Sequence, residues 1–275
     1  MTTTTPYNIP GFKTLLVGAV GTGKTHSLRT LVDAGLEVFA IFTEPGMEVV
    51  ADIPTDKLHW KYLSPSTTSW EAMLDSAKKL NTLSFESLTK LPHINRGEHN
   101  EFLDLINALA SFTDDRTGKN FGPVDNFTTN QVLWIDSLSG INIMAMNLIA
   151  GSKPVKSPGD WGCAMDNLER LIQKLTTDLQ CHVVVTAHLE REQDEVTGGS
   201  TLMVSTLGRK LAPKIPRFFS DVIHVKRSEK AFTWSTVTAN TDLKARNIAW
   251  ADNLPPSFVP LVEAWKKKQV QPATA

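Results

Sequence analysis

Short apolar runs alternate with longer amphipathic stretches along most of the chain. The runs are rich in β-branched residues and predict strands over 12–17, 36–42, 58–63, 131–135, 182–186, 222–225 and 231–237. Apolar residues at helical spacing predict helices over 25–34, 69–80, 98–112, 138–149 and 161–180. Strands that alternate with helices are typical of βα units. The pattern therefore predicts an α/β fold with a mostly parallel central sheet flanked by helices and a C-terminal antiparallel extension.

Length and composition favour one domain over two. The 275 residues are 41% hydrophobic and 21% charged, which suffices for a sizeable core. We expect a single domain over 1–265, with a helical insertion at about 64–130 and a polar tail at 266–275. No apolar run reaches the roughly 20 residues that span a bilayer, and the N-terminus lacks a signal pattern. We therefore expect a cytoplasmic protein without a membrane partner.

The first chemical motif follows the first predicted strand. The segment GAVGTGKT fits the phosphate-binding pattern G-x-x-x-x-G-K-[ST] at every fixed position. Its glycines leave backbone N–H groups open to a triphosphate, because no Cβ intrudes there. Lys24 is expected to reach the β and γ phosphates, and the Thr25 hydroxyl to hold Mg²⁺. The motif predicts an ATP and Mg²⁺ site with nucleotide contacts at Gly18, Ala19, Val20, Gly21, Thr22, Gly23, Lys24, Thr25 and His26.

Two carboxylates extend this site. The buried run QVLWID ends in Asp136, where a Walker B strand places the acid that holds the metal. Asp136 alternatively caps the helix predicted from Leu138. Because Ser137 rather than a glutamate follows, the group that activates water must lie elsewhere. Glu44, after the second strand, is the best candidate; the alternative is an acid at a helix N-terminus before Pro45.

A phosphate loop, a Glu after the second strand and an Asp-Ser pair after the Walker B strand together resemble the RecA-like ATPases. From about Gly11 to Arg246, ending near TDLKARN, the chain resembles phage-encoded, AAA-type RecA-like ATP-binding proteins of the Sak-type single-strand annealing group. The resemblance implies a RecA-like P-loop core that self-associates into a ring or filament. It also implies catalytic roles for Lys24, Glu44 and His188, the last as a sensor of the γ phosphate. His188 is alternatively an ordinary histidine at a strand end.

The resemblance implies contacts beyond the nucleotide. Lys210 and Lys214 resemble bases that a filament offers in trans to the γ phosphate of a neighbouring subunit, although a solvated helix face is an equal alternative. Single-stranded DNA is expected at two loops, which carry Lys153, Lys156 and Arg191. A phage single-strand binding or replication protein is a further expected partner.

Charge alone does not decide among functions. The net charge of −1 gives no overall attraction to nucleic acid. Between Ser205 and Lys230, seven bases face two acids, which is either a local binding patch or a solvated face. The segment EREQDE after His188 is acidic. We therefore predict an ATPase of phage DNA recombination or single-strand annealing that couples ATP to single-stranded DNA. A nucleotide-gated protein that binds a protein partner, and a small-molecule kinase, remain open.

Overall fold

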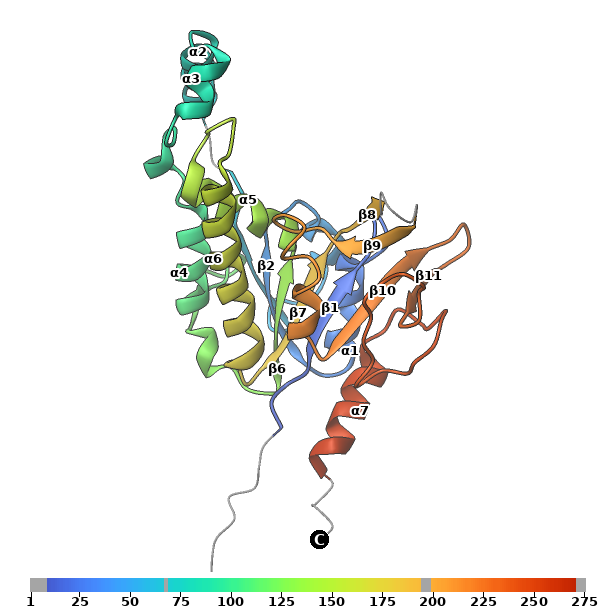
Figure 1. Ribbon diagram of the computed structural model, residues 1–275. Coiled ribbons are helices and arrows are strands. Elements are labelled where there is room, and N and C mark those ends of the chain that lie inside the picture. The colour runs from blue at the N-terminus through green and yellow to red at the C-terminus, as the bar shows by residue number, and fades with distance from the viewer. Residues whose placement is uncertain (1–8, 67–68, 194–198, 271–275) are drawn as a thin grey trace, which may run out of the picture.

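The central sheet has seven strands in the order β11-β10-β1-β7-β6-β2-β3, of which only the edge strand β11 runs antiparallel to its neighbour (Figure 1). The computed structural model describes residues 9–66, 69–193 and 199–270. The sheet strands are β1 Lys13–Val17, β2 Glu37–Phe42, β3 Leu58–Tyr62, β6 Gln131–Asp136, β7 His182–Ala187, β10 Asp221–Arg227 and β11 Phe232–Ser235. Two small antiparallel sheets pair β4 Phe112–Thr113 with β5 Asn120–Gly122, and β8 Leu189–Gln193 with β9 Ser200–Val204. The predicted α/β class, with its antiparallel extension, is confirmed.

Helices cover both faces of the sheet (Figure 1). They are α1 Arg29–Asp33, α2 Trp70–Asn81, α3 Phe85–Lys90, α4 Glu101–Ala110, α5 Leu138–Ala150, α6 Pro158–Thr177 and α7 Val259–Val270. Short 3-10 turns are η1 Thr25–Leu28, η2 Met47–Val50, η3 Arg96–Glu98, η4 Val124–Asn126 and η5 Ile215–Phe218. Figure 1 shows α2 and α3 projecting beyond the body that the other helices and the sheet form.

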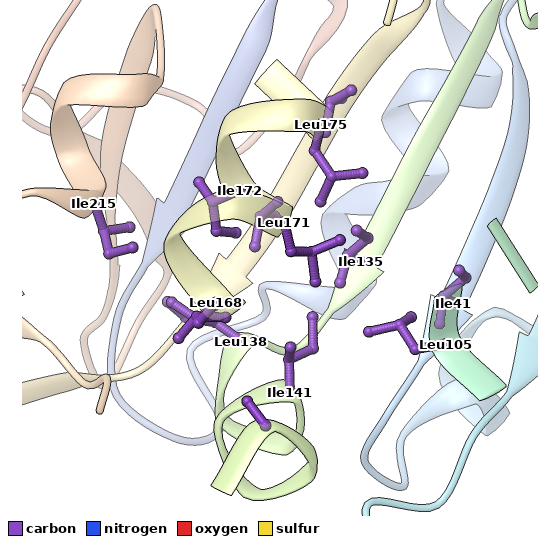
Figure 2. Close-up of a cluster of buried hydrophobic side chains, with 14 of the residues drawn as sticks. Ile41, Leu105, Ile135, Leu138, Ile141, Leu168, Leu171, Ile172, Leu175 and Ile215 are labelled. Carbon is purple, nitrogen blue, oxygen red and sulfur yellow. The ribbon is translucent and has the colours of Figure 1, made fainter. Parts of the chain in front are cut away.

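Alternate residues of each strand enter two separate cores, because successive strand side chains point to opposite faces. On one face, Leu133 and Ile135 of β6 pack with α4, α5 and α6. Figure 2 shows this core, where Leu138 and Ile141 of α5 meet Leu168 of α6. On the other face, Val132 and Trp134 pack with α1 and α7. Strands covered on both sides read as continuous apolar runs, and for this reason the sequence predicts them well.

Several predicted boundaries are wrong. The helix predicted over 161–180 begins three residues earlier, because Ser157 and Asp160 form a capping box around Pro158. The helix predicted over 98–112 is the shorter α4, and the residues that follow it form β4. Helix α7 continues to Val270, so the first half of the predicted polar tail is helical, while 271–275 lie outside the described residues. Across the described ranges, none of the helices combines the length and apolar character that crossing a membrane requires.

Because β1, β2, β6 and β7 are parallel, their carboxyl ends lie at the same edge of the sheet. The register pairs Phe42 with Asp136, and Val17 with Ala187. The segments that continue from these ends carry the phosphate loop, Glu44 and His188. In open α/β sheets, ligands bind at this carboxyl edge. The fold therefore brings together the four segments that the sequence singles out.

Candidate nucleotide-binding site

The phosphate loop connects β1 to η1 and keeps its shape through its glycines. A Cβ on Gly18 would lie 2.5 Å from the carbonyl oxygen of Val225 in β10. Gly23 has φ +88°, a left-handed conformation that a residue with a side chain rarely adopts. The loop thus requires glycine for close strand approach at one position and for backbone conformation at the other.

Lys24 lies buried under its own loop. Its Nζ donates to the carbonyl oxygens of Gly18 and Ala19, both at 2.9 Å. Burial lowers the pKa of Lys24, while the negative charges of Asp136 and Glu44 act in the opposite direction. The amine is thus held in the centre of the carboxyl edge, between the loop and both acids.

Asp136 and Thr25 supply an oxygen pair suited to Mg²⁺. The Thr25 hydroxyl donates to Oδ2 of Asp136 at 2.6 Å, and the Thr186 hydroxyl donates to Oδ1 at 2.6 Å. Asp136 is buried, and Trp134 of the same strand approaches Oδ2 with its indole N–H at 3.5 Å. Hydroxyl and carboxylate oxygens are ligands that Mg²⁺ prefers, so the residues present fit this ion. The structure places both predicted metal residues together and adds Thr186, which orients the carboxylate.

Glu44 and His188 form a polar chain with Lys24. His188 Nε2 lies 3.5 Å from Oε2 of Glu44, and its Nδ1 lies 3.5 Å from Nζ of Lys24. The contact with His188 lowers the pKa of Glu44, with further lowering by Ser137 and Lys24 and an opposing contribution from burial. Glu44 is therefore ionised near neutral pH, as a residue that accepts a proton from water must be.

A hydroxyl clip fixes the position of Glu44. The Thr43 Oγ1 accepts from the backbone N–H of Ser137 and donates to its carbonyl oxygen, both at 2.9 Å. The backbone N–H of Thr43 also donates to the carbonyl of Asp136 at 2.6 Å. The peptide bond between Asp136 and Ser137 is cis. Thr43, which the sequence did not single out, thus ties the end of β2 to the start of α5.

These groups surround one open cleft of about 360 Å³. Of the predicted nucleotide contacts, all except Gly18 and Ala19 line it, and those two instead hold Lys24 through their carbonyls. Sequence reasoning missed four further residues of the lining, which are Pro45, Gly46, Val49 and Phe232. Phe232 belongs to β11, more than two hundred positions along the chain from the loop, and no local pattern links the two.

The predicted DNA-loop residues do not share one environment. Lys153 is 3% exposed and donates to Oδ2 of Asp160 at 2.8 Å. This pair of a buried lysine and a half-buried aspartate anchors the start of α6. A contact between Lys153 and DNA would require the lysine to leave Asp160, and it stays a prediction. Arg191 is exposed on β8, and Lys156 is half-buried. The last two residues of the acidic segment EREQDE, at 194 and 195, lie outside the described residues.

The two lysines predicted to act in trans lie away from the cleft of their own chain. Lys214 donates to both carboxylate oxygens of Glu169 in α6, at 2.9 and 3.2 Å. Lys210 is exposed, and it lines with Lys214 and Glu169 a shallow depression beside α6. Neither side chain lines the nucleotide cleft, so a role for either in hydrolysis requires a second subunit and stays a prediction.

A phosphate loop, a buried lysine and a threonine-aspartate pair at the carboxyl edge of a parallel sheet define a P-loop ATPase fold. The model of the AAA domain family matches residues 11–247, and the chain belongs to this family. An AAA domain implies binding and hydrolysis of a nucleoside triphosphate, for which Mg²⁺ is the typical metal.

Comparison with individual proteins adds a distant likeness. No curated protein matches the chain. A similar solved structure is the assembled ATPase EscN from the enteropathogenic E. coli (EPEC) type III secretion system, at 14% sequence identity and a TM-score of 0.36. The similarity covers 79% of this chain and 43% of EscN, so the chain spans less than half the length of that protein.

Proposed function

We propose that this chain is an ATPase of phage DNA recombination or single-strand annealing, which couples hydrolysis of ATP to single-stranded DNA. One observation carries the proposal. His188 contacts both Lys24 and Glu44, and the β8–β9 hairpin begins at the next residue. A movement of His188 when the γ phosphate is lost would therefore pass along the backbone directly to a surface hairpin.

In this mechanism, Lys24 leaves its loop carbonyls to bind the β and γ phosphates, and the N–H groups of the glycine loop surround them. Thr25 and Asp136 would hold Mg²⁺, which when bound offsets the charge of the phosphate oxygens. Glu44 orients the attacking water and accepts its proton. His188, hydrogen-bonded to Glu44, responds when the γ phosphate departs.

The hairpin borders a second groove that suits a single strand. The groove, of about 560 Å³, is lined by Trp161, Arg191 and Arg209 among others. The acidic residues beside it are engaged within the protein. Glu192 pairs with Arg209 at 2.8 Å, and Glu190 accepts from the hydroxyl of Ser205. An exposed indole and arginine side chains that line the same groove support stacking of bases together with contacts to the phosphate backbone.

The test is ATP hydrolysis with and without a thymidine homopolymer, at low and at higher salt, with Lys24→Ala as the blank. We expect several-fold stimulation that weakens with salt, because phosphate contacts release counterions. Trp161→Ala and Arg191→Ala should reduce the stimulated rate, whereas Arg170→Ala, exposed farther along α6, should not. Unchanged hydrolysis with no DNA retained at low salt would rule out the DNA role.

A second candidate is a nucleotide-gated assembly protein. The projecting α2–α3 hairpin supports it, because Trp70 is 85% exposed and Phe85, Met73 and Leu74 are exposed with it. Exposed apolar groups gathered on one projection are typical of protein-binding surfaces. Nucleotide-dependent association that Trp70→Ser abolishes, without any effect of DNA, would favour this function.

A further inference from the structure

The strand order indicates on which side of β1 the nucleoside of a bound triphosphate would lie. Glu44, Asp136 and His188 follow β2, β6 and β7, which all lie on one side of β1 in the sheet. Strands β10 and β11 lie on the other side of β1. A triphosphate bound over the loop after β1, with its terminal phosphate near Glu44, therefore points its nucleoside toward β10 and β11.

A phenyl ring lies on that side of the cleft. Phe232 lines the cleft and is 45% exposed. Three of its ring carbons lie 3.3–3.6 Å from the position that a Cβ on Gly23 would occupy. The glycine thus makes room for the ring beside the phosphate loop. Of the described residues that line the cleft, no other carries a phenyl or indole ring.

The neighbouring strand supports this ring. Arg227 pairs with Phe232 across β10 and β11, and its guanidinium carbon lies 5.7 Å from the ring centre. The Nη1 of Arg227 also lies 3.5 Å from the carbonyl oxygen of Gly21, within the phosphate loop. The Arg227 guanidinium and the adjacent Gly23 hold Phe232 in place, while 45% of its surface stays exposed.

We propose that Phe232 is the surface on which the purine base of the nucleotide stacks. The inference rests on the nucleotide site proposed above and assigns its base end. Stacking uses the π-face that every base has. Phe232 therefore raises affinity for a nucleoside triphosphate over a bare polyphosphate, and it does not discriminate adenine from guanine.

The experiment compares two ligands, ATP and inorganic tripolyphosphate, each with Mg²⁺, by calorimetric titration of the full chain. Phe232→Ala should weaken ATP binding about tenfold and leave tripolyphosphate affinity unchanged, because only ATP carries a base. Phe232→Tyr should retain ATP affinity, and Phe232→Leu, which keeps apolar bulk without a π-face, should lose most of it. Trp250→Ala, which removes an exposed aromatic ring that does not line the cleft, is the matched control and should bind both ligands as the wild type does.

Each contrary result has a distinct meaning. Equal loss of ATP and tripolyphosphate in Phe232→Ala would overturn the stacking role and make the ring a support for the phosphate loop. Wild-type ATP affinity in Phe232→Ala would overturn it as well. Failure of the wild-type chain to bind either ligand would overturn the nucleotide site itself together with its base end.

Discussion

The role of Glu44 as the group that accepts a proton from water is supported more by its neighbours in the fold than by its position in the sequence. The Thr43 clip fixes the backbone beside it, and the hydrogen bond with His188 is the largest cause of the lowering of its pKa. Both contacts come from segments far along the chain. Because the Glu44 carboxylate is ionised and faces the cleft, it is the group best placed to accept a proton from water.

Replacement of Glu44 by glutamine should separate binding from turnover. Gln keeps the size and polarity of the side chain but accepts no proton, so we expect ATP affinity to stay within a few-fold while hydrolysis falls by about 10²–10⁴. Steady-state hydrolysis and nucleotide titration of the same preparation measure the two effects. Glu48→Gln, an exposed residue in the turn that follows, is the control and should hydrolyse ATP normally. A normal rate in Glu44→Gln would place the base elsewhere.

His182 couples stability to pH. Burial, with a smaller contribution from the positive charge of Lys13, lowers the pKa of His182 from 6.5 to about 3. Its Nδ1 accepts the backbone N–H of Phe12 at 3.0 Å, and its ring stacks on that of Phe12. The unfolded chain binds a proton at His182 below about pH 6.5, whereas the folded chain does so only near pH 3. The free energy of unfolding therefore falls through this window as pH drops and is insensitive to this group above it.

His182→Asn should flatten that dependence. Asn offers an amide oxygen to the Phe12 N–H and cannot be protonated. We expect the variant to be less stable at pH 7, yet to lose about 3 kcal/mol less than the wild type between pH 7 and pH 4. Urea unfolding at several pH values measures the difference, and His93→Asn, an exposed histidine, should follow the wild-type slope. Parallel curves for His182→Asn and the wild type would contradict the assignment.

At the scale of the element, two helical glycines have opposite surroundings. A Cβ on Gly140, near the start of α5, would lie 2.3 Å from the Oγ1 of Thr43. A Cβ on Gly162 in α6 would meet nothing within 4 Å. Helix propensity favours alanine at both positions by the same amount, so any difference between the two substitutions reports packing.

Gly162→Ala should stabilise the protein by about 0.5–1 kcal/mol, through helix propensity alone. Gly140→Ala should destabilise it by about 1–3 kcal/mol, because the added methyl overpacks the contact between α5 and Thr43. Displacement of Thr43 should also slow hydrolysis, since Glu44 is the next residue. Chemical unfolding and ATPase rates of both variants provide the measurement. Equal stability of the two would contradict the role given to the Thr43 clip.

Strands buried on both sides were predictable from the sequence, and the exposed β8–β9 hairpin was not. Five of the six parallel strands, which are β1, β2, β6, β7 and β10, carry apolar runs because their side chains enter the cores on both faces of the sheet. The strands β8 and β9 form a solvent-facing hairpin, and the sequence LEREQ of β8 shows no apolar run. Phe258 and Trp265 anchor helix α7 in the core on the face of the sheet that α1 covers. The last turn of α7 is basic, and this composition is typical of a solvent-exposed tail.

The residues of the candidate site likewise fall into those that the sequence predicts and those that it does not. The phosphate loop and Asp136 are local motifs, so the residues that carry them are found in one segment each. Thr43, Thr186 and Phe232 act across strands, and their contacts exist only once the sheet is assembled. Lys153 shows the converse case, because its charge favours a surface position while its ion pair with Asp160 holds the side chain in the interior.

At the scale of the whole molecule, the nucleotide cleft joins segments that are distant in the sequence. It is lined from the ends of β1, β2, β6 and β7 and from the edge strand β11. A ligand that contacts all of them binds only the folded chain. Nucleotide binding should therefore stabilise the fold as a unit, by an amount that follows the ligand concentration relative to its dissociation constant.

That stabilisation should depend on magnesium through Asp136. At about 100 times the dissociation constant, ATP with Mg²⁺ should add about 2.7 kcal/mol, which for a chain of this size raises the Tm by roughly 5–8 °C. Asp136→Asn preserves the size of the side chain but removes the charge that faces the metal. Its Tm in ATP should therefore be the same with Mg²⁺ as with EDTA. Thermal unfolding with ATP alone, Mg²⁺ alone and both together separates these effects. If the wild type showed equal shifts in Mg²⁺ and EDTA, Thr25 and Asp136 would not be the metal site.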